Sequence, residues 1–300
     1  MTIWIDTHVH VSDLGPDGGP REHLLDDLLA VLDAEAADLR LVISPDAAWL
    51  SRIINEPDGQ VHAARFIHDL VRRAPGRLYG ACCVNPHHLD FALQAMDLCH
   101  GEFGFPLFGE MLQYMMDYRM NSPAVETLVR RAVEFDVPVQ VHISTSNSAQ
   151  GNFTSGNEEL ADLCDLYDKV PEAKVILAHF VGTDKLPPVV DGYLDDLDRR
   201  YGRFPENMWA EIRDFSSPGV KSALDRIPHD RIIAGTDWVT RVGPPFPPYG
   251  VLFPATSAEE NPYPPSVAAM ADLLRAAGAD GRSLTLIAHE NAASLLHLPL

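Results

Sequence analysis

The feature that most constrains the fold of this chain is the alternation of short apolar runs with longer amphipathic stretches. The stretches carry apolar residues at helical spacing, as in Arg21 to Ala37, Ser122 to Phe135 and Asn157 to Asp168. Eight runs have the length of a strand: Ile3 to Val11, Leu39 to Ser44, Leu78 to Asn85, Phe103 to Leu112, Val137 to Ser144, Ala173 to Val181, Met208 to Ile212 and Arg231 to Trp238. Strands separated by helices pair in parallel, so eight such units predict an α/β fold closed into a (β/α)8 TIM barrel.

The length of the chain fits this barrel as a single domain over residues 1–300. A proline-rich stretch, Thr240 to Pro265, follows the eighth run and can form neither a regular helix nor a central strand. Because it follows a strand, we expect it to lie over the carboxyl-end mouth of the barrel, as a lid or a pocket wall.

Charge and cysteine content restrict the partners and the compartment. The chain has 23 basic and 43 acidic residues, for a net charge of −20, which repels nucleic acid and anionic membranes. The start of the sequence has no signal-peptide pattern, and no apolar run is long enough to span a membrane. The four cysteines lack CxxC spacing, so we interpret them as reduced, buried thiols. We expect a cytoplasmic protein that acts on a small molecule and, if it assembles, forms a homodimer.

Two histidines stand at the end of the first run, in the segment Asp6-Thr7-His8-Val9-His10. The period-two geometry of a strand sends His8 and His10 to the same face. Two imidazoles on one face suggest a metal site, although a pair of packed or surface histidines is the commoner explanation when the motif is taken alone.

Three more polar residues close later strands. His142, His179 and Asp237 each stand at the carboxyl end of a predicted parallel strand. Parallel strands of a barrel share one direction, so these ends meet at one mouth although they span more than two hundred positions. The pattern therefore predicts a functional site that combines the first, fifth, sixth and eighth strands.

Taken together, these motifs resemble the amidohydrolase superfamily, in particular its amidohydrolase-related branch of the aminocarboxymuconate semialdehyde decarboxylase type. The motifs that carry the resemblance span nearly the whole chain: Ile5-Asp6-Thr7-His8-Val9-His10, Val141-His142, Leu177-Ala178-His179, Gly235-Thr236-Asp237-Trp238 and His289-Glu290-Asn291-Ala292-Ala293-Ser294-Leu295-Leu296. They are specific for the superfamily and say little about the substrate.

The resemblance implies one divalent metal ion. Its ligands would be His8, His10, His142 and Asp237, and His179 would lie close by without binding the metal. Imidazole and carboxylate ligands with an open position suit zinc, whose bound water ionises near neutral pH. In catalysis Asp237 would take a proton from that water, and His179 would polarise a substrate oxygen or orient the water.

A second metal ion depends on the fourth strand. Many binuclear members of the superfamily use a carboxylated lysine there, but the only lysines in this chain are Lys169, Lys174, Lys185 and Lys221, and none stands at that strand's carboxyl end. Glu110 occupies a position where some relatives use a bridging glutamate. It can hold a second metal ion or hydrogen-bond the substrate or a neighbouring strand.

Other residues near the strand ends are candidates for supporting roles. We expect Asp6 to orient the histidines through hydrogen bonds or to cap a turn. Arg213 and Arg241 are placed to grip a substrate carboxylate, or else to form surface ion pairs with the many acidic residues. Trp238 and Phe108 can wall an apolar substrate pocket, or simply pack in the core.

These features leave three functions open. The first is hydrolysis of an ester, lactone or amide bond of a small organic acid-type substrate by zinc-bound hydroxide, which the chemistry of the superfamily favours. The second is nonoxidative decarboxylation of a small aromatic or unsaturated carboxylic acid on the same ligands. The third is a catalytically silent barrel, which the retention of so many costly polar groups disfavours.

Overall fold

The computed structural model describes residues 3–14, 19–143, 156–182, 187–239 and 267–300. Within these residues the strands form one nine-stranded sheet in the order β8-β7-β6-β5-β4-β3-β2-β1-β9, and every neighbouring pair is parallel. The strands are β1 (Ile3–Val11), β2 (Asp38–Pro45), β3 (Leu78–Cys82), β4 (Leu107–Met111), β5 (Val139–His142), β6 (Val175–Val181), β7 (Met208–Ile212), β8 (Ile232–Ala234) and β9 (Trp238–Val239).

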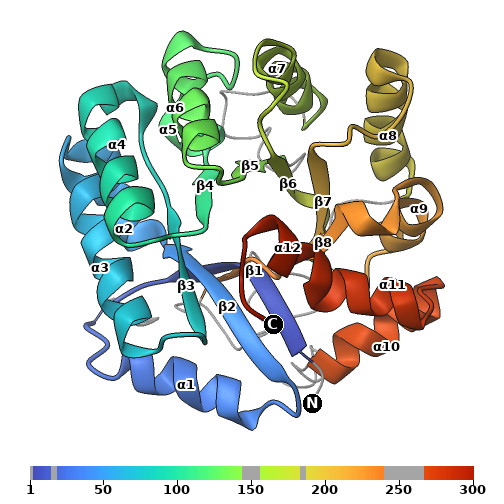
Figure 1. Cartoon of the computed structure of the whole chain (residues 1–300), viewed down its shortest axis with the longest axis horizontal. Helices are drawn as coiled ribbons and strands as arrows, with labels where there is room; N and C mark the ends of the chain where they lie inside the picture. Colours follow the sequence, from blue (N-terminus) through green and yellow to red (C-terminus); the bar gives the residue numbers. More distant parts are fainter. Residues whose placement is uncertain (1–2, 15–18, 144–155, 183–186, 240–266) are drawn as a thin grey trace.

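The sheet closes into a barrel at residues 232–239, which contain β8 and β9. β8 pairs with β7, and β9, which follows it after a three-residue break, pairs with β1. The hydroxyl of Thr7 on β1 also donates to the carbonyl of Ala234 at 2.9 Å. The passage 232–239 therefore acts as one interrupted eighth strand. The predicted barrel is confirmed, and Figure 1 shows its strands inside a ring of helices.

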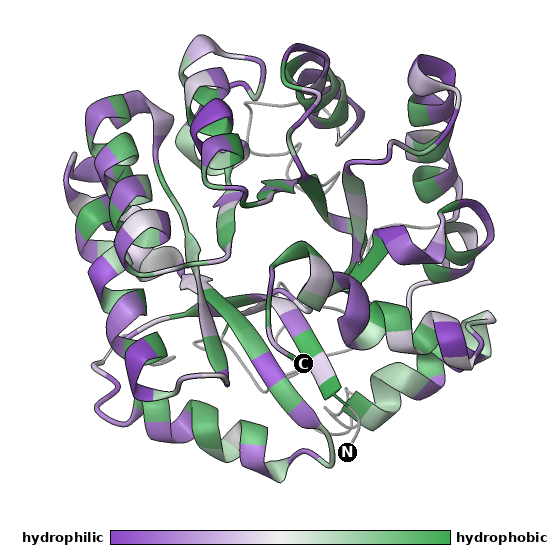
Figure 2. Cartoon of the chain, in the orientation of Figure 1, coloured by the Kyte–Doolittle hydropathy of each residue, from purple (hydrophilic) through white to green (hydrophobic). Residues whose placement is uncertain are grey.

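The helices follow the strands in the predicted alternation. They are α1 (Leu24–Ala34), α2 (Ala47–Asn55), α3 (Gly59–Arg73), α4 (Leu89–Met96), α5 (Gln113–Met116), α6 (Pro123–Glu134), α7 (Gly156–Lys169), α8 (Pro187–Tyr201), α9 (Gly219–Arg226), α10 (Val267–Ala277), α11 (Gly281–Thr285) and α12 (Asn291–Leu295), with short turns of 3-10 or π helix at Pro86–His88, Asp97–Glu102, His229–Arg231 and Leu286–Glu290. Figure 2 shows hydrophilic and hydrophobic residues side by side on most of them, as expected of helices that cover a sheet on one face only.

Local signals fix several of these elements. Ser122 caps α6 in an extended conformation and Pro123 is its first helical residue, as predicted. The fourth predicted strand begins later than expected, at Leu107, because residues 103–106 form a loop in which Gly104 has a left-handed φ of +68°. No helix among the described residues is long and apolar enough to cross a membrane.

Two apolar layers fill the fold. The larger lies between the strands and the surrounding helices and includes Trp4. The smaller contains Ile5, the next residue of β1, with side chains from other strands and from α12. Neighbouring residues of one strand thus pack on opposite sides of the barrel wall. Figure 1 shows α12 beside β1 and β8, where its apolar residues complete the smaller layer.

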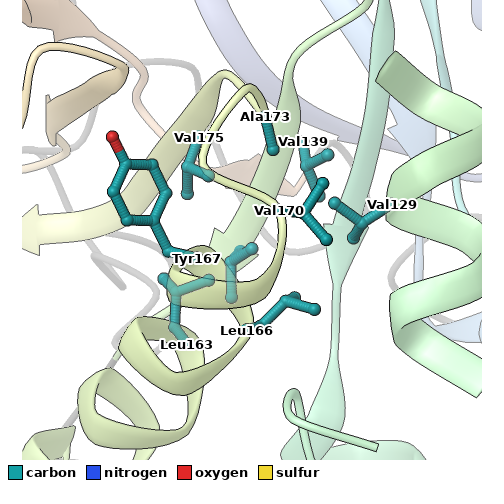
Figure 3. A pocket seen from close by; sticks show the side chains of 9 residues that line it. Val129, Val139, Leu163, Leu166, Tyr167, Val170, Ala173 and Val175 are labelled. Carbon is teal, nitrogen blue, oxygen red and sulfur yellow. The ribbon is translucent and has the colours of Figure 1, made fainter. Parts of the chain in front are cut away.

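The outer layer is closely packed. Between α6, α7 and β5 it encloses a void of about 10 Å³, lined by apolar side chains (Figure 3). A void of this size holds one water molecule at most, and its lining offers no partner for that water. The proline-rich stretch that we expect over the mouth, Thr240 to Pro265, lies outside the described residues.

Candidate metal centre

Two histidines of β1 form one side of a buried polar cluster. The Nε2 atoms of His8 and His10 lie 3.0 Å apart. Nδ1 of His8 lies 2.9 Å from the Glu211 carboxylate, and Nδ1 of His10 lies 3.0 Å from the carbonyl of Pro45. A carbonyl and a carboxylate only accept hydrogen bonds, so both rings donate from Nδ1. When the rings are neutral, both Nε2 atoms then direct a lone pair toward the same point.

Two carboxylates complete the cluster. Oε2 of Glu110 on β4 lies 3.2 Å from His8 Nε2 and 3.4 Å from His10 Nε2. Oδ1 of Asp237, in the break between β8 and β9, lies 3.2 Å from His10 Nε2. Gly109 precedes Glu110 with a φ of +134°, and a Cβ atom there would lie 2.5 Å from the carbonyl of Gln140. Only glycine allows β4 to approach β5 this closely.

The donor atoms fit a metal ion. Two sets of ligand atoms lie within 4.8 Å of one another: His8, Glu110 and His179 form one, and His8, His10 and Asp237 the other. Neutral imidazole lone pairs and carboxylates that converge out of water repel one another unless a cation lies between them. Nitrogen and oxygen donors of this kind suit a divalent cation such as zinc or manganese. Both sets share His8, so they belong to one cluster.

Protons on the histidines supply that positive charge in the metal-free protein. Burial lowers the pKa of His10, but hydrogen bonds with Asp237 and Glu110 outweigh it and raise the pKa to about 9. Burial likewise acts against a charged His8, and the carboxylates of Glu211, Glu110 and Asp237 together hold its pKa well above the usual value. The site therefore attracts cations.

The pKa values of the two carboxylates shift in the opposite direction, below their usual values. Burial would raise the pKa of Glu110, but the nearby His8 and His179, with hydrogen bonds from His10 and His142, hold it well below its usual range. Burial also opposes ionisation of Asp237, where the charge of Arg213 and the neighbouring histidines keep the pKa well below normal. Both acids are ionised at neutral pH.

His142 at the end of β5 joins the cluster through Glu110. Its Nδ1 lies 2.9 Å from Oε1 of Glu110, and its ring meets the His179 ring edge to face at a centroid distance of 4.7 Å. Tyr114 covers the ring of His142, with centroids 4.4 Å apart. Among the described residues His142 belongs to neither of the two donor sets, so its role as a direct ligand stays a prediction.

His179 at the end of β6 is held in an unusual backbone conformation. Its φ is +54°, a left-handed value that residues other than glycine rarely adopt. Nε2 of His179 lies 3.2 Å from Oδ2 of Asp237 and 3.5 Å from Oε1 of Glu110. Burial lowers its pKa to about 4, against the pull of both carboxylates, so the ring is neutral. Asp237 has a similar φ of +53°, and such outliers cluster at functional sites.

Arg213, directly after β7, forms a buried ion pair with Asp237. Its Nε lies 3.0 Å from Oδ2 of Asp237, and the arginine is 5% exposed. Among the described residues this carboxylate is the partner of its side chain. The pair is buried, so it is not the surface salt bridge that was the alternative for Arg213. Binding of a substrate carboxylate by Arg213 stays a prediction. The guanidinium has further N–H groups that can donate to such a carboxylate.

Asp6 links β1 to the turn that carries Asp237. Its Oδ1 accepts hydrogen bonds from the amides of His8 at 3.1 Å and Thr236 at 2.9 Å, and its Oδ2 accepts from the Thr236 hydroxyl at 2.6 Å. Burial raises the pKa of Asp6 to about 6, although the hydrogen bonds from Thr236 act in the other direction. The expected supporting role through hydrogen bonds is therefore seen in its contacts.

The remaining candidates are placed apart from the cluster or outside the described residues. Phe108 is fully buried in the layer under the helices, where its ring meets the edge of His100 at 6.3 Å. Trp238 is buried in the same layer, at the start of β9. Arg241 lies outside the described residues. Substrate contacts for these three residues stay predictions.

Glu211 on β7 was not among the candidate site residues predicted from the sequence, yet it contacts both His8 and His179. Gln140 on β5, also missed, donates to Glu211 at 2.7 Å. The available signal was an acidic residue inside the apolar run Met208 to Ile212, on the same face of the strand as Arg213. A charge in a buried strand needs a partner, but the sequence does not identify which residue it is.

The sequence matches one family model. The family is described as Amidohydrolase, and the match covers residues 5–298. No curated protein matches the sequence.

Several solved structures share the fold over nearly the whole chain. A 2,6-dihydroxybenzoate decarboxylase from Rhizobium is 16% identical with a TM-score of 0.68, and 99% of each chain is covered. A dihydroxybenzoic acid decarboxylase from Polaromonas, with bound manganese and 2-nitroresorcinol, is 16% identical with a TM-score of 0.67 over 99% of this chain and 98% of that chain. A 5-carboxyvanillate decarboxylase from Novosphingobium aromaticivorans, also with manganese, is 14% identical with a TM-score of 0.65 over 99% and 96%. At these identities the likeness shows the fold alone.

Proposed function

This chain belongs to the amidohydrolase family, and we propose that it is a metal-dependent decarboxylase of a small aromatic or unsaturated carboxylic acid. The proposal rests on the state of Asp237. Its Oδ2 is held by the buried guanidinium of Arg213 at 3.0 Å and faces His179 at 3.2 Å. The decarboxylases that share the fold, two of them with bound manganese, support the same choice.

The cluster would hold one divalent metal ion through His8, His10 and Asp237, with Glu110 and His142 beside them. The donors suit zinc, our expectation from the sequence, and also manganese, as in the relatives. When bound, the metal supplies a positive charge that stabilises negative charge developing on the substrate. Glu110 joins one of the donor sets and, in this proposal, serves the same single ion.

The low basicity of the flanking groups argues against hydrolysis. A hydrolase needs a group that accepts a proton from the attacking water. Arg213 keeps the pKa of Asp237 well below normal, and burial lowers the pKa of His179 to about 4. Neither residue is a good proton acceptor near neutral pH, so neither readily activates a water molecule for attack.

Decarboxylation requires different chemical steps at the same residues. The bond between the substrate carbon and its carboxylate breaks, carbon dioxide leaves, and the bonding electron pair remains on the carbon. One proton from solvent then binds that carbon. In this proposal the proton comes from solvent, and His179 and Asp237, which face each other at 3.2 Å, flank the substrate that receives it. Arg213 would hold the substrate carboxylate before it leaves.

The test is carbon dioxide release in heavy water. We would load the protein with Mn²⁺ or Zn²⁺, supply a panel of hydroxybenzoic and unsaturated carboxylic acids, and follow gas release and product NMR. We expect one carbon dioxide per acid consumed and one deuterium at the carbon that lost the carboxylate. Metal-stripped protein is the control.

A different outcome would replace the proposal. If the loaded protein releases no carbon dioxide from the panel but cleaves esters, lactones or amides with release of acid, the enzyme is a hydrolase. That is the second candidate, which the description of the matched family favours.

A further inference from the structure

Glu211, the fourth residue of the five-residue strand β7, is a fully buried carboxylate. Three groups donate to it: His8 Nδ1 to Oε1 at 2.9 Å, the amide of His179 to Oε1 at 3.2 Å, and Gln140 Nε2 to Oε2 at 2.7 Å. Removing a carboxylate from water is costly unless donors replace the lost hydration. Donors from β1, β5 and β6 replace the lost hydrogen bonds to water. Glu211 on β7 therefore connects four strands at one point.

The contact with His8 determines which ring nitrogen faces the cluster. Because the carboxylate accepts from Nδ1, the neutral ring has its lone pair on Nε2. That atom lies 3.2 Å from Oε2 of Glu110 and 3.7 Å from Oδ1 of Asp237. Without Glu211 the ring could carry its proton on Nε2, or turn about its χ angles, and the lone pair would be lost from the centre.

The contact with His179 fixes a second member of the cluster. Its amide donates to the same oxygen as His8 Nδ1, while its backbone has a φ of +54°. A left-handed conformation at such a residue persists only where the surroundings hold it. The rings of His8 and His179 stack with centroids 5.0 Å apart. One carboxylate thus holds the ring of His8 and the backbone of His179, whose rings stack.

The neighbouring strand leaves room for this carboxylate. A Cβ atom at Gly235, directly after β8, would lie 2.5 Å from Cδ and 2.6 Å from Oε2 of Glu211. The space that glycine leaves open is the space that the Glu211 side chain fills. The two positions therefore fit each other across β7 and β8.

We propose that Glu211 is a positioning residue that orients His8 for metal binding and keeps its Nε2 free for the ion. The inference rests on the metal site of the proposed function and is independent of the reaction that occurs there. Glu211 touches neither substrate nor metal in this role. Hydrogen-bond partners of metal-bound histidines commonly account for 10- to 100-fold in metal affinity, which makes the role measurable.

The experiment measures metal binding without substrate. Glu211→Gln keeps the size of the side chain and removes its charge. We expect its affinity for Mn²⁺, measured by equilibrium dialysis, to fall about 10- to 100-fold. The visible absorption of bound Co²⁺ should also change, because His8 no longer meets the ion in the same orientation. Gln140→Leu removes only one donor to Glu211 and should cause a smaller loss of affinity.

The matched control is Asp162→Asn. Asp162 on α7 is also a buried carboxylate, paired with Arg119, but it lies outside the cluster. This variant should lose stability and keep both its Mn²⁺ affinity and its Co²⁺ spectrum. If Glu211→Gln behaves in the same way, Glu211 is merely structural and the inference is wrong. If Glu211→Gln does not fold, Gln140→Leu decides: an unchanged affinity and spectrum would overturn the inference.

The wild-type protein separates this inference from the proposed function. A wild type that binds no metal overturns the metal centre and the role of Glu211 together. A wild type that binds metal, with weaker binding in Glu211→Gln but no carbon dioxide release, leaves Glu211 as a positioning residue and overturns only the reaction.

Discussion

The two ends of the barrel use the same strands for opposite purposes. At the carboxyl ends, buried histidines and carboxylates of β1, β4, β5 and β6 meet Asp237. At the other end, apolar side chains meet α12 in a small closed core: Ile5, Val42, Ala81, Leu107, Ile176, Ile233, Ala292, Ala293, Leu295 and Leu296. On β1, Ile5 in that core and His8 in the cluster are three positions apart.

This difference separates stability from chemistry along each strand. Burial of apolar area at the α12 end stabilises the fold. The polar end buries charges that attract and repel one another, which costs free energy unless each has a partner. The barrel can hold such a cluster because its other apolar layers offset that cost. Variants at the two ends should therefore affect different measurements.

The largest effect is expected from a change at the polar end. His10→Ala removes an imidazole from the donor set His8, His10 and Asp237. We expect turnover to fall by more than about 100-fold, the upper range for losing only a partner of a ligand. Metal content per chain should fall with it, while circular dichroism shows a folded barrel. Retained turnover in a folded, metal-poor variant would contradict the division between the two ends.

The next effect belongs to the apolar end. Leu295→Ala leaves a cavity where α12 packs against the strands. We expect the free energy of unfolding to fall by about 2–5 kcal/mol, as for other buried leucines. Denaturant titration measures this loss. Turnover and metal content per folded molecule should remain those of the wild type, and a loss of either would show that the ends are coupled.

The smallest effect concerns protons at the polar end. In the metal-free protein the pKa of His10 is raised from 6.5 to about 9, and that of His8 is held well above its usual value. At pH 7.5 the pair therefore holds at least one proton on its facing Nε2 atoms, which lie 3.0 Å apart, and this proton must leave when a metal ion binds. Metal uptake should release at least about one proton per ion, and affinity should rise with pH toward about 9.

Calorimetry in buffers with different ionisation enthalpies counts these protons. The expected release falls as the pH rises above the pKa of His10, because that ring has then already lost its proton. Uptake at pH 7.5 with no proton release would mean that the histidines are neutral in the metal-free protein. The charges of Glu110 and Asp237 would then need another partner.

Much of the barrel was predictable because its signals are local. Apolar runs of strand length, amphipathic helices and the Ser122-Pro123 helix start all act within a few residues. The same holds for His8 and His10, which the period of a strand places on one side. The late start of β4 was not predicted, because residues 103–106 form a loop with a left-handed Gly104 although Phe103 and Phe105 read as part of an apolar run.

The candidate site was predictable as a set of strand ends and not as a set of contacts. Parallel strands of a barrel bring His142, His179 and Asp237 to one mouth whatever the loops do. Whether Arg213 would meet Asp237 or face solvent depends on side-chain directions at neighbouring strand ends. Phe108 illustrates the limit, because its side chain packs under the helices, away from the mouth.

The sequence by itself determined the order of strands and helices and placed His8, His10, His142, His179 and Asp237 at strand ends, because both follow from local geometry. Only the tertiary structure decided that one carboxylate, Glu211, serves both His8 and His179, and that Gly235 leaves space for it. Those contacts join strands that are far apart in the chain. They form only when the barrel closes. Closure buries these polar groups, and a buried polar group is stable only with a hydrogen-bond partner from a neighbouring strand.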